Sequence, residues 1–148
     1  MSNVDVHVEI FLPDVQRDTT THAPLGVLDA LVAFEENKAF LLNLHVEDSH
    51  RKKGLGTRLL YEFASYLWRT VHSNASKFII EVDDCSSRYH DAENNIYCKA
   101  GFCYKEPDGP EMQTNLKKFF SSISSQVDIY NASSLSQGKN WETSLKFV

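Results

Sequence analysis

The chain has 148 residues, of which 42% are hydrophobic and 24% charged, values typical of one globular domain. Its formal net charge of −5 disfavours a nucleic-acid-binding protein, because such proteins normally carry a basic face. The first residues do not resemble a signal peptide, and no apolar run is long enough to span a bilayer. Three cysteines without a CxxC spacing favour a reducing compartment. The sequence therefore predicts a cytoplasmic protein that binds neither nucleic acid nor membrane.

Hydrophobic periodicity predicts three strands in the first third of the chain. Residues 4–12 alternate with period two, which is typical of a half-buried strand. A polar loop over residues 14–24 leads to two further strand candidates, over residues 25–35 and 39–47. Because a short turn joins these two segments, we expect an antiparallel hairpin, with a helix in the first of them as the alternative.

A basic, glycine-rich turn follows the third strand. Its sequence is RKKGLG, residues 51–56, and an amphipathic helix extends from it to about His72. Glycines let the backbone turn tightly and bring its N–H groups close to a ligand. A helix N-terminus also attracts anions, and the basic side chains add to this attraction. The turn is therefore predicted to bind a phosphate or pyrophosphate, although a basic turn that only caps the helix is the alternative.

The segment after this helix predicts a mixed sheet. Residues 77–83 form a mostly apolar strand, expected to run parallel to the third strand because the two flank a helix. A polar loop, a short helix over residues 94–100, a strand over 102–106 and an antiparallel strand over 111–117 follow. The acidic residues and histidine of the polar loop match no metal-ligand spacing, so no metal is expected.

The C-terminal segment is rich in serine, which biases it toward disorder. Its phenylalanine, isoleucine and tryptophan residues argue against complete disorder. We therefore expect one domain over residues 1–118 and a partly ordered appendage over 119–148. The appendage is expected to dock on the domain or on a partner subunit.

Two motifs resemble those of the GNAT superfamily of acyl-CoA-dependent N-acyltransferases. Residues 97–102, YCKAGF, match the family signature Y-x-K-x-G-F, and residues 51–56 match its pyrophosphate loop R/Q-x-x-G-x-G/A. Leu44 and Val46 stand where the family has its L-x-V strand end. The resemblance implies an α/β (α+β) fold with a mixed, mostly antiparallel sheet and a βαβ coenzyme-binding unit. The loop over residues 14–24 is too short for the two N-terminal helices that are usual in the family.

The resemblance also implies a function. It implies transfer of an acetyl group from acetyl-CoA, as cosubstrate and without a metal, to a primary amine that attacks directly. The acceptor would be a protein lysine, an N-terminus or a small amine. The turn would bind the pyrophosphate, the third strand would pair with the pantetheine arm, and the parted third and fourth strands would hold the thioester. The implied coenzyme-binding residues are Leu44, His45, Val46, Arg51, Lys52, Lys53, Gly54, Leu55, Gly56, Thr57, Arg58, Asn94 and Tyr97, with Ser86, His90 or Asn95 as alternatives to Asn94.

Tyr97 matches the family tyrosine that protonates or hydrogen-bonds the leaving sulfur, and a purely structural core aromatic is the alternative. Glu81 is the preferred general base, because a carboxyl group among apolar residues can have a raised pKa. Asp83, His45 and a water chain are the other candidates, and Glu81 could also be an ordinary surface carboxylate. Cys98 is expected to be a small buried residue and not a nucleophile.

A second functional class is a catalytically silent coenzyme-A-binding or protein-interaction domain of the same fold. The presence of Tyr97 favours the enzyme, whereas the missing acceptor helices favour the silent domain. Without those helices the acceptor pocket would be open, or completed by the C-terminal segment or by a second subunit of a homodimer.

Overall fold

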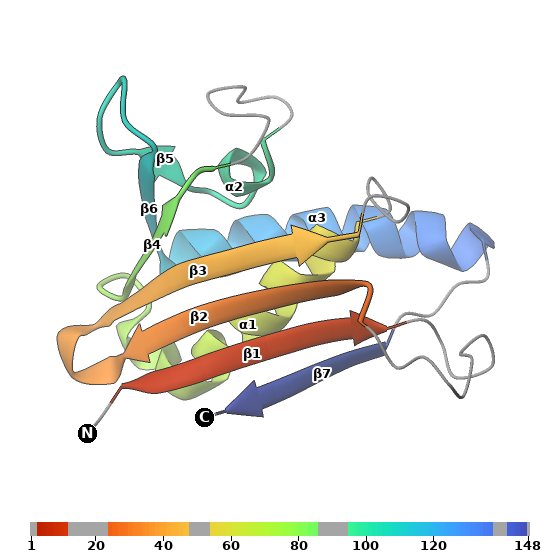
Figure 1. Cartoon of the computed structure of the whole chain (residues 1–148), viewed down its shortest axis with the longest axis horizontal. Coiled ribbons are helices and arrows are strands. Elements are labelled where there is room, and N and C mark those ends of the chain that lie inside the picture. The colour runs from red at the N-terminus through yellow and green to blue at the C-terminus, as the bar shows by residue number, and fades with distance from the viewer. Residues whose placement is uncertain (1–2, 12–23, 48–53, 86–94, 138–141, 148) are drawn as a thin grey trace.

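The computed structural model describes residues 3–11, 24–47, 54–85, 95–137 and 142–147, with side chains as far as residue 128. Within this part of the chain, seven strands form one sheet in the order β5–β6–β4–β3–β2–β1–β7 (Figure 1). The strands are β1 (Val4–Phe11), β2 (Gly26–Ala33), β3 (Lys38–Val46), β4 (Ile79–Asp83), β5 (Cys103–Tyr104), β6 (Glu111–Asn115) and β7 (Glu142–Phe147). The helices are α1 (Leu55–Val71), α2 (Ile96–Lys99) and α3 (Leu116–Gln137), with 3-10 turns at Phe34–Glu36 and His72–Asn74.

Strand pairing confirms the mixed, mostly antiparallel sheet. Strands β1, β2 and β3 form an antiparallel meander, which excludes the alternative of a helix in the second segment. Strands β3 and β4 pair in parallel on either side of α1, as the βαβ arrangement predicts. Strand β6 then pairs antiparallel with both β4 and β5. The loop between β1 and β2, where the family has two helices, lies mostly outside the described residues.

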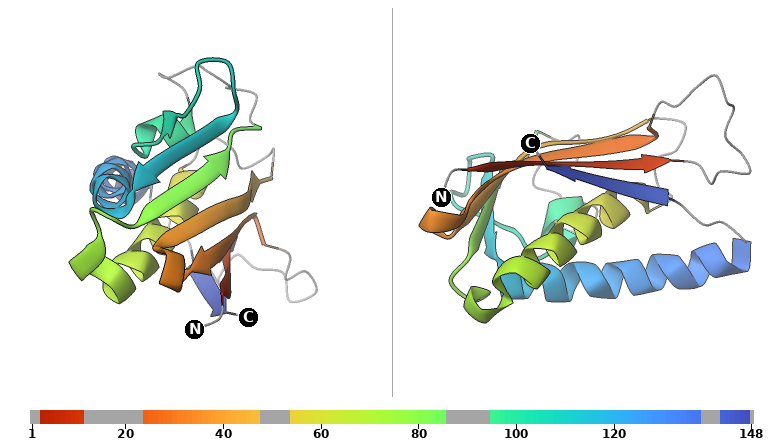
Figure 2. Two further views of the ribbon diagram at one scale, coloured as in Figure 1. Left: turned by 90° about the vertical axis from the view of Figure 1, so that its left-hand side faces the viewer. Right: turned by 90° about the horizontal axis from the view of Figure 1, so that it is seen from below.

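Helices α1 and α3 cover the same face of the sheet, and the opposite face carries no described helix (Figure 2). The side chains of α1 that were expected to form its apolar stripe are buried: Leu55, Leu59, Leu60, Phe63, Ala64 and Leu67. They pack on the inward-facing residues of β1 and β2, which alternate with residues on the open face because side chains of a strand point to opposite sides. None of the described helices is long and apolar enough to cross a membrane.

The last predicted strand, over residues 111–117, is wrong at its C-terminal end. The strand stops at Asn115, and the chain continues as a helix. The Asn115 side chain accepts a hydrogen bond from the Lys118 backbone N–H at 2.8 Å. Asparagine is a favourable residue at a helix N-terminus, since its side chain satisfies an N–H group that has no partner within the helix. Strand β6 therefore stops at Asn115 and α3 begins at Leu116.

The predicted division at residue 118 falls inside α3, so the structure corrects this boundary. Phe119 and Ile123 are buried in the same core cluster as Phe63 of α1. The rings of Phe63 and Phe119 lie 6.3 Å apart. Strand β7 follows α3 and pairs antiparallel with β1, adding an edge strand to the sheet. Residues that looked like a polar appendage thus complete both the helical layer and the sheet.

Candidate functional site

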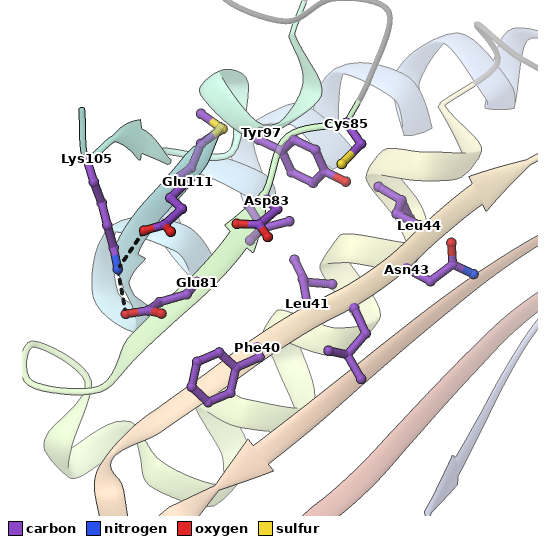
Figure 3. Close-up of a pocket in the computed structure, with 13 residues that line it drawn as sticks. Phe40, Leu41, Asn43, Leu44, Glu81, Asp83, Cys85, Tyr97, Lys105 and Glu111 are labelled. Carbon is purple, nitrogen blue, oxygen red and sulfur yellow. Dashed lines mark hydrogen bonds and ion pairs between the residues drawn. The ribbon is translucent and has the colours of Figure 1, made fainter. Parts of the chain in front are cut away.

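A cavity of about 690 Å³ opens where β3 and β4 separate (Figure 3). Its lining comes from β3, β4, α2 and the β5–β6 hairpin, which are distant in sequence. The lining residues are Phe40, Leu41, Leu42, Asn43, Leu44, Glu81, Val82, Asp83, Cys85, Tyr97, Lys105, Glu111 and Met112. The cavity therefore contains three of the residues predicted for the site, Leu44, Glu81 and Tyr97, and also the alternative base Asp83.

The separation of the two parallel strands begins at a bulge in β3. Pairing between β3 and β4 ends at the pair Leu41–Val82. On the other side of β3, Leu41 pairs with Ala30 and Asn43 with Asp29, so Leu42 is an extra residue in the strand. A bulge bends its strand and increases the local twist, which carries β3 away from β4. Among the described residues, no strand then pairs with the β4 side of residues 42–45, which leaves an extended edge facing the cavity.

Tyr97 lies in the first turn of α2, and its hydroxyl points into the cavity (Figure 3). The residue is 8% exposed, and its ring packs edge-to-face on Phe102 with centroids 5.9 Å apart. Within the described part of the chain, its hydroxyl makes no hydrogen bond. Burial raises the pKa of Tyr97 to about 12, and the negative charges of Asp84 and Cys85 add to the rise. The phenol is therefore protonated at neutral pH and has a hydrogen-bond donor available to a ligand.

A buried polar network holds α2 in place. Asn95 is fully buried, and its side-chain oxygen accepts hydrogen bonds from the N–H groups of Tyr97 and Cys98 at 2.9 and 3.1 Å. Its amide nitrogen donates to Asp84 at 2.7 Å, and the Tyr104 hydroxyl donates to the same carboxylate oxygen. Asp84 is 2% exposed and follows β4 directly. The network therefore joins β4, β5 and α2, and it fixes the direction of Tyr97.

This network was not predicted from the sequence, in which Asn95 was only an alternative contact for the pantetheine arm. The structure corrects that alternative, because both ends of the Asn95 side chain bind protein groups. The Ser/Asn/Asp preference at helix N-termini was the available signal for Asn95. Nothing in the local sequence indicates that Tyr104 reaches Asp84.

Replacing Asn95 by alanine should lower the free energy of unfolding by about 2 to 3 kcal/mol, because it removes a helix cap and leaves a buried carboxylate short of one donor. Urea denaturation followed by circular dichroism measures this loss. Asn115→Ala is the matched control, since it removes a cap at an exposed position. We expect this control substitution to lower the free energy of unfolding by about 1 kcal/mol. Equal losses in the two variants would contradict the role assigned to the buried network.

Glu81 lines the cavity, but its surroundings differ from those expected. Its Oε1 atom lies 3.0 Å from the Lys105 ammonium and 3.7 Å from the Lys38 ammonium. The hydrogen bond to Glu81 raises the pKa of Lys105, which therefore stays charged. The structure thus corrects the premise of a carboxyl group among apolar side chains: Glu81 is an ion-paired carboxylate on the open face of the sheet.

Asp83 and Glu111 form a pair of like charges at the mouth of the cavity. They are direct neighbours in the antiparallel pairing of β4 and β6. Carboxylates opposite one another on adjacent strands repel and destabilise the pair. Lys105 lies 3.9 Å from Glu111, but its shorter contact is with Glu81. Figure 3 shows the Asp83 carboxylate directed into the cavity, where a positively charged ligand would relieve the repulsion.

The turn before α1 has the backbone form expected of an anion site. Gly54 adopts a left-handed conformation, with φ of 82°, as the N-cap of α1, and no side chain caps this helix end. The first N–H groups of a helix have no partner within it, so they remain available to an anion. Gly56 lies close to α2, because a Cβ atom added there would be 2.9 Å from Ile96 Cδ1. Leu55 and Thr57 are buried, whereas the Arg58 side chain lies 3.4 Å from Glu62.

The remaining predicted residues divide into two groups. Arg51, Lys52, Lys53 and Asn94 lie outside the described residues, as do Ser86 and His90. His45 is exposed and Val46 half-buried on β3, and neither lines the cavity. The cysteine in the cavity is Cys85, not Cys98. Cys98, which was expected to be a small buried residue and not a nucleophile, is half-buried and packs against the core.

Similarity to known proteins is found at the level of structure. No protein-family model and no curated protein matches the sequence. Thirty-three solved chains match the structure, among them AtaTR bound with acetyl-CoA, Tetrahymena GCN5 and a GNAT-family acetyltransferase from Staphylococcus aureus.

The AtaTR match has a TM-score of 0.52 at 20% identity and covers 70% of this chain and 65% of that chain. The GCN5 match has a TM-score of 0.48 at 14% identity, and the S. aureus match has 0.49 at 15% identity. Both of these cover 74% of this chain and 68% of theirs. At sequence identities of 20% or less, these matches show that the fold is similar.

Proposed function

Since this chain has the fold of the GNAT acyltransferases, we propose that it transfers an acetyl group from acetyl-CoA to a primary amine. The observation that carries the proposal is the cavity between the parted parallel strands, with the Tyr97 hydroxyl directed into it. AtaTR, which shares this fold, was solved with acetyl-CoA bound, and this supports the choice of cosubstrate.

In the proposed complex the coenzyme crosses the gap between the two strands. The N-terminal amides of α1 receive the pyrophosphate, and Arg51, Lys52 and Lys53 add positive charge beside them. The pantetheine arm pairs with the edge of β3 at Leu44, like an added strand. This route brings the thioester to Tyr97, at the far side of the same cavity.

The acceptor amine reaches the thioester from the open face of the sheet. An ammonium group must lose a proton before it can attack, so a base at the cavity mouth favours the reaction. Asp83 suits this role better than Glu81, because its carboxylate points into the cavity, whereas Glu81 is bound by two lysines. After attack, Tyr97 donates a hydrogen bond to the leaving thiolate.

Calorimetric titration with coenzyme A and acetyl-CoA tests the binding half of the proposal, and about micromolar affinity is expected for either ligand. Acetyl transfer is then measured by mass spectrometry on a panel of small amines, lysine peptides and peptides with free N-termini. Product with any member establishes the enzyme. Binding without transfer to any member would favour the silent coenzyme-binding domain, and the absence of binding would exclude both.

Asp83→Asn should lower kcat/KM for the best acceptor about 100-fold, since it removes the base while keeping the size of the side chain. Glu81→Gln should cost much less, because it removes the charge that pairs with Lys105 and Lys38 but leaves the Asp83 carboxylate at the cavity mouth intact. Steady-state kinetics of the two variants decide between them. The opposite order of effects would return the base role to Glu81.

A further inference from the structure

Cys85 is a thiol in the cavity to which the proposed reaction gives no role. It follows Asp84 at the end of β4, is exposed, and lines the cavity together with Tyr97. Figure 3 shows its sulfur and the Tyr97 hydroxyl directed into the same part of the cavity. The negative charge of Cys85 contributes to the raised pKa of Tyr97, which agrees with this proximity.

The Tyr97 hydroxyl offers a hydrogen-bond donor to a ligand in the part of the cavity that Cys85 also faces. More than nine-tenths of Tyr97 is buried, and the hydroxyl has no hydrogen-bond partner among the described residues, although it points into an open cavity. The hydroxyl can therefore donate a hydrogen bond to an acceptor atom of a ligand in the cavity. If the proposed function holds, that acceptor is the sulfur atom of the coenzyme.

We propose that Cys85 is a modification site that forms a mixed disulfide with coenzyme A bound in the cavity. The inference rests on the proposed function, because the coenzyme must first bind with its sulfur beside Tyr97. The co-reactant is coenzyme A disulfide. The Cys85 thiolate attacks one of its sulfur atoms, the disulfide bond breaks, and a Cys85–sulfur bond forms. The second coenzyme A leaves as a thiolate and takes up the proton that Cys85 released.

The adduct would inactivate the site reversibly. The bound coenzyme would occupy the pantetheine path along β3 and would cover Tyr97, so acetyl-CoA could not enter. A small thiol would restore the free cysteine by a second exchange. The protein would then respond to the ratio of coenzyme A disulfide to coenzyme A as well as to acetyl-CoA concentration.

The test compares two disulfides on the reduced full-length protein. The protein is incubated with coenzyme A disulfide or with glutathione disulfide at about pH 8, where an ordinary thiol is partly ionised. Modified peptides are then quantified by mass spectrometry. Cys85 should react with coenzyme A disulfide about tenfold or more faster than with glutathione disulfide, because binding raises the local concentration of the reagent. The exposed Cys103, outside the cavity, is the control and should show no such preference.

Three further measurements separate the outcomes. Cys85→Ser should abolish the preferred adduct, and the wild-type adduct should lose acetyl-CoA binding until dithiothreitol restores it. Equal rates with the two disulfides at Cys85 would overturn the inference, because they would describe only an exposed thiol. If coenzyme A binds the reduced protein in calorimetry but coenzyme A disulfide forms no adduct at Cys85, the inference is also overturned, while the proposed function stays intact. If coenzyme A does not bind at all, both the inference about Cys85 and the proposed function are overturned.

Discussion

Replacing Gly56 by leucine should weaken coenzyme A binding at least about 100-fold, a loss of roughly 2.7 kcal/mol in binding free energy. A Cβ atom at this position would already be 2.9 Å from Ile96 Cδ1, and the rest of a leucine side chain has no room there. The substitution would push α2 away from the start of α1. It would therefore disturb the proposed pyrophosphate amides and Tyr97 together.

Two variants make this result interpretable. Gly56→Ala should have a small effect, since the atom that it meets is the mobile end of the Ile96 side chain and alanine favours a helix. Gly109→Leu should leave binding unchanged, because a Cβ atom there has its nearest neighbour at 3.4 Å. Circular dichroism must show that Gly56→Leu still folds. Unaltered affinity in the folded variant would refute the location of the coenzyme site.

Replacing Tyr97 by phenylalanine should lower kcat about 100-fold and change the KM for acetyl-CoA little. The ring contact with Phe102 is retained, so only the hydroxyl is lost. Because the Tyr97 pKa is raised to about 12 and an ordinary thiol has a pKa near 8.5, complete proton transfer to the thiolate would be unfavourable by roughly 5 kcal/mol. Tyr97 is therefore expected to stabilise the leaving thiolate as a hydrogen-bond donor.

The pH dependence of kcat checks this role independently. Tyr97 must be protonated to donate, so its ionisation removes activity as pH rises through its pKa. With that pKa raised to about 12, the wild-type rate should show no loss from Tyr97 up to about pH 10. Tyr61→Phe on α1 is a suitable control, since Tyr61 lies outside the cavity lining and packs on Phe120. A falling limb near pH 10 that disappears in Tyr97→Phe would contradict the effect of burial on this phenol.

The elements with regular periodicity were predictable because local sequence determines them. The alternation in β1 and the apolar stripe of α1 are each visible in the order of apolar and polar residues within a single segment. In the C-terminal segment, the helix was not predicted although its apolar residues are periodic. Its serines suggested disorder, but Leu116, Phe119, Ile123 and Val127 recur at helical spacing, and all four are buried. Composition concealed a periodic signal that was present.

Three residues that the sequence suggested for the site lie close together in the structure. Tyr97, Leu44 and Glu81 were identified from motifs and strand position, and all three line one cavity. Partners far apart in the chain were not predictable. Lys105 binds Glu81 across 24 positions, and Tyr104 binds Asp84 across 20. Such contacts depend on the pairing of β4 with β6, two strands that are not consecutive in the chain, for which no local signal exists.

The sequence by itself determined most of the elements before residue 116, the glycine turn that begins α1 and the tyrosine in the first turn of α2, since each of these depends on the conformational preferences of a few adjacent residues. Only the tertiary structure decided where these elements act. The bulge at Leu42 parts β3 from β4, and α3 and β7 complete layers begun by the N-terminal residues. Those arrangements arise from the burial of apolar faces contributed by distant segments, and that burial is a property of the folded chain as a whole.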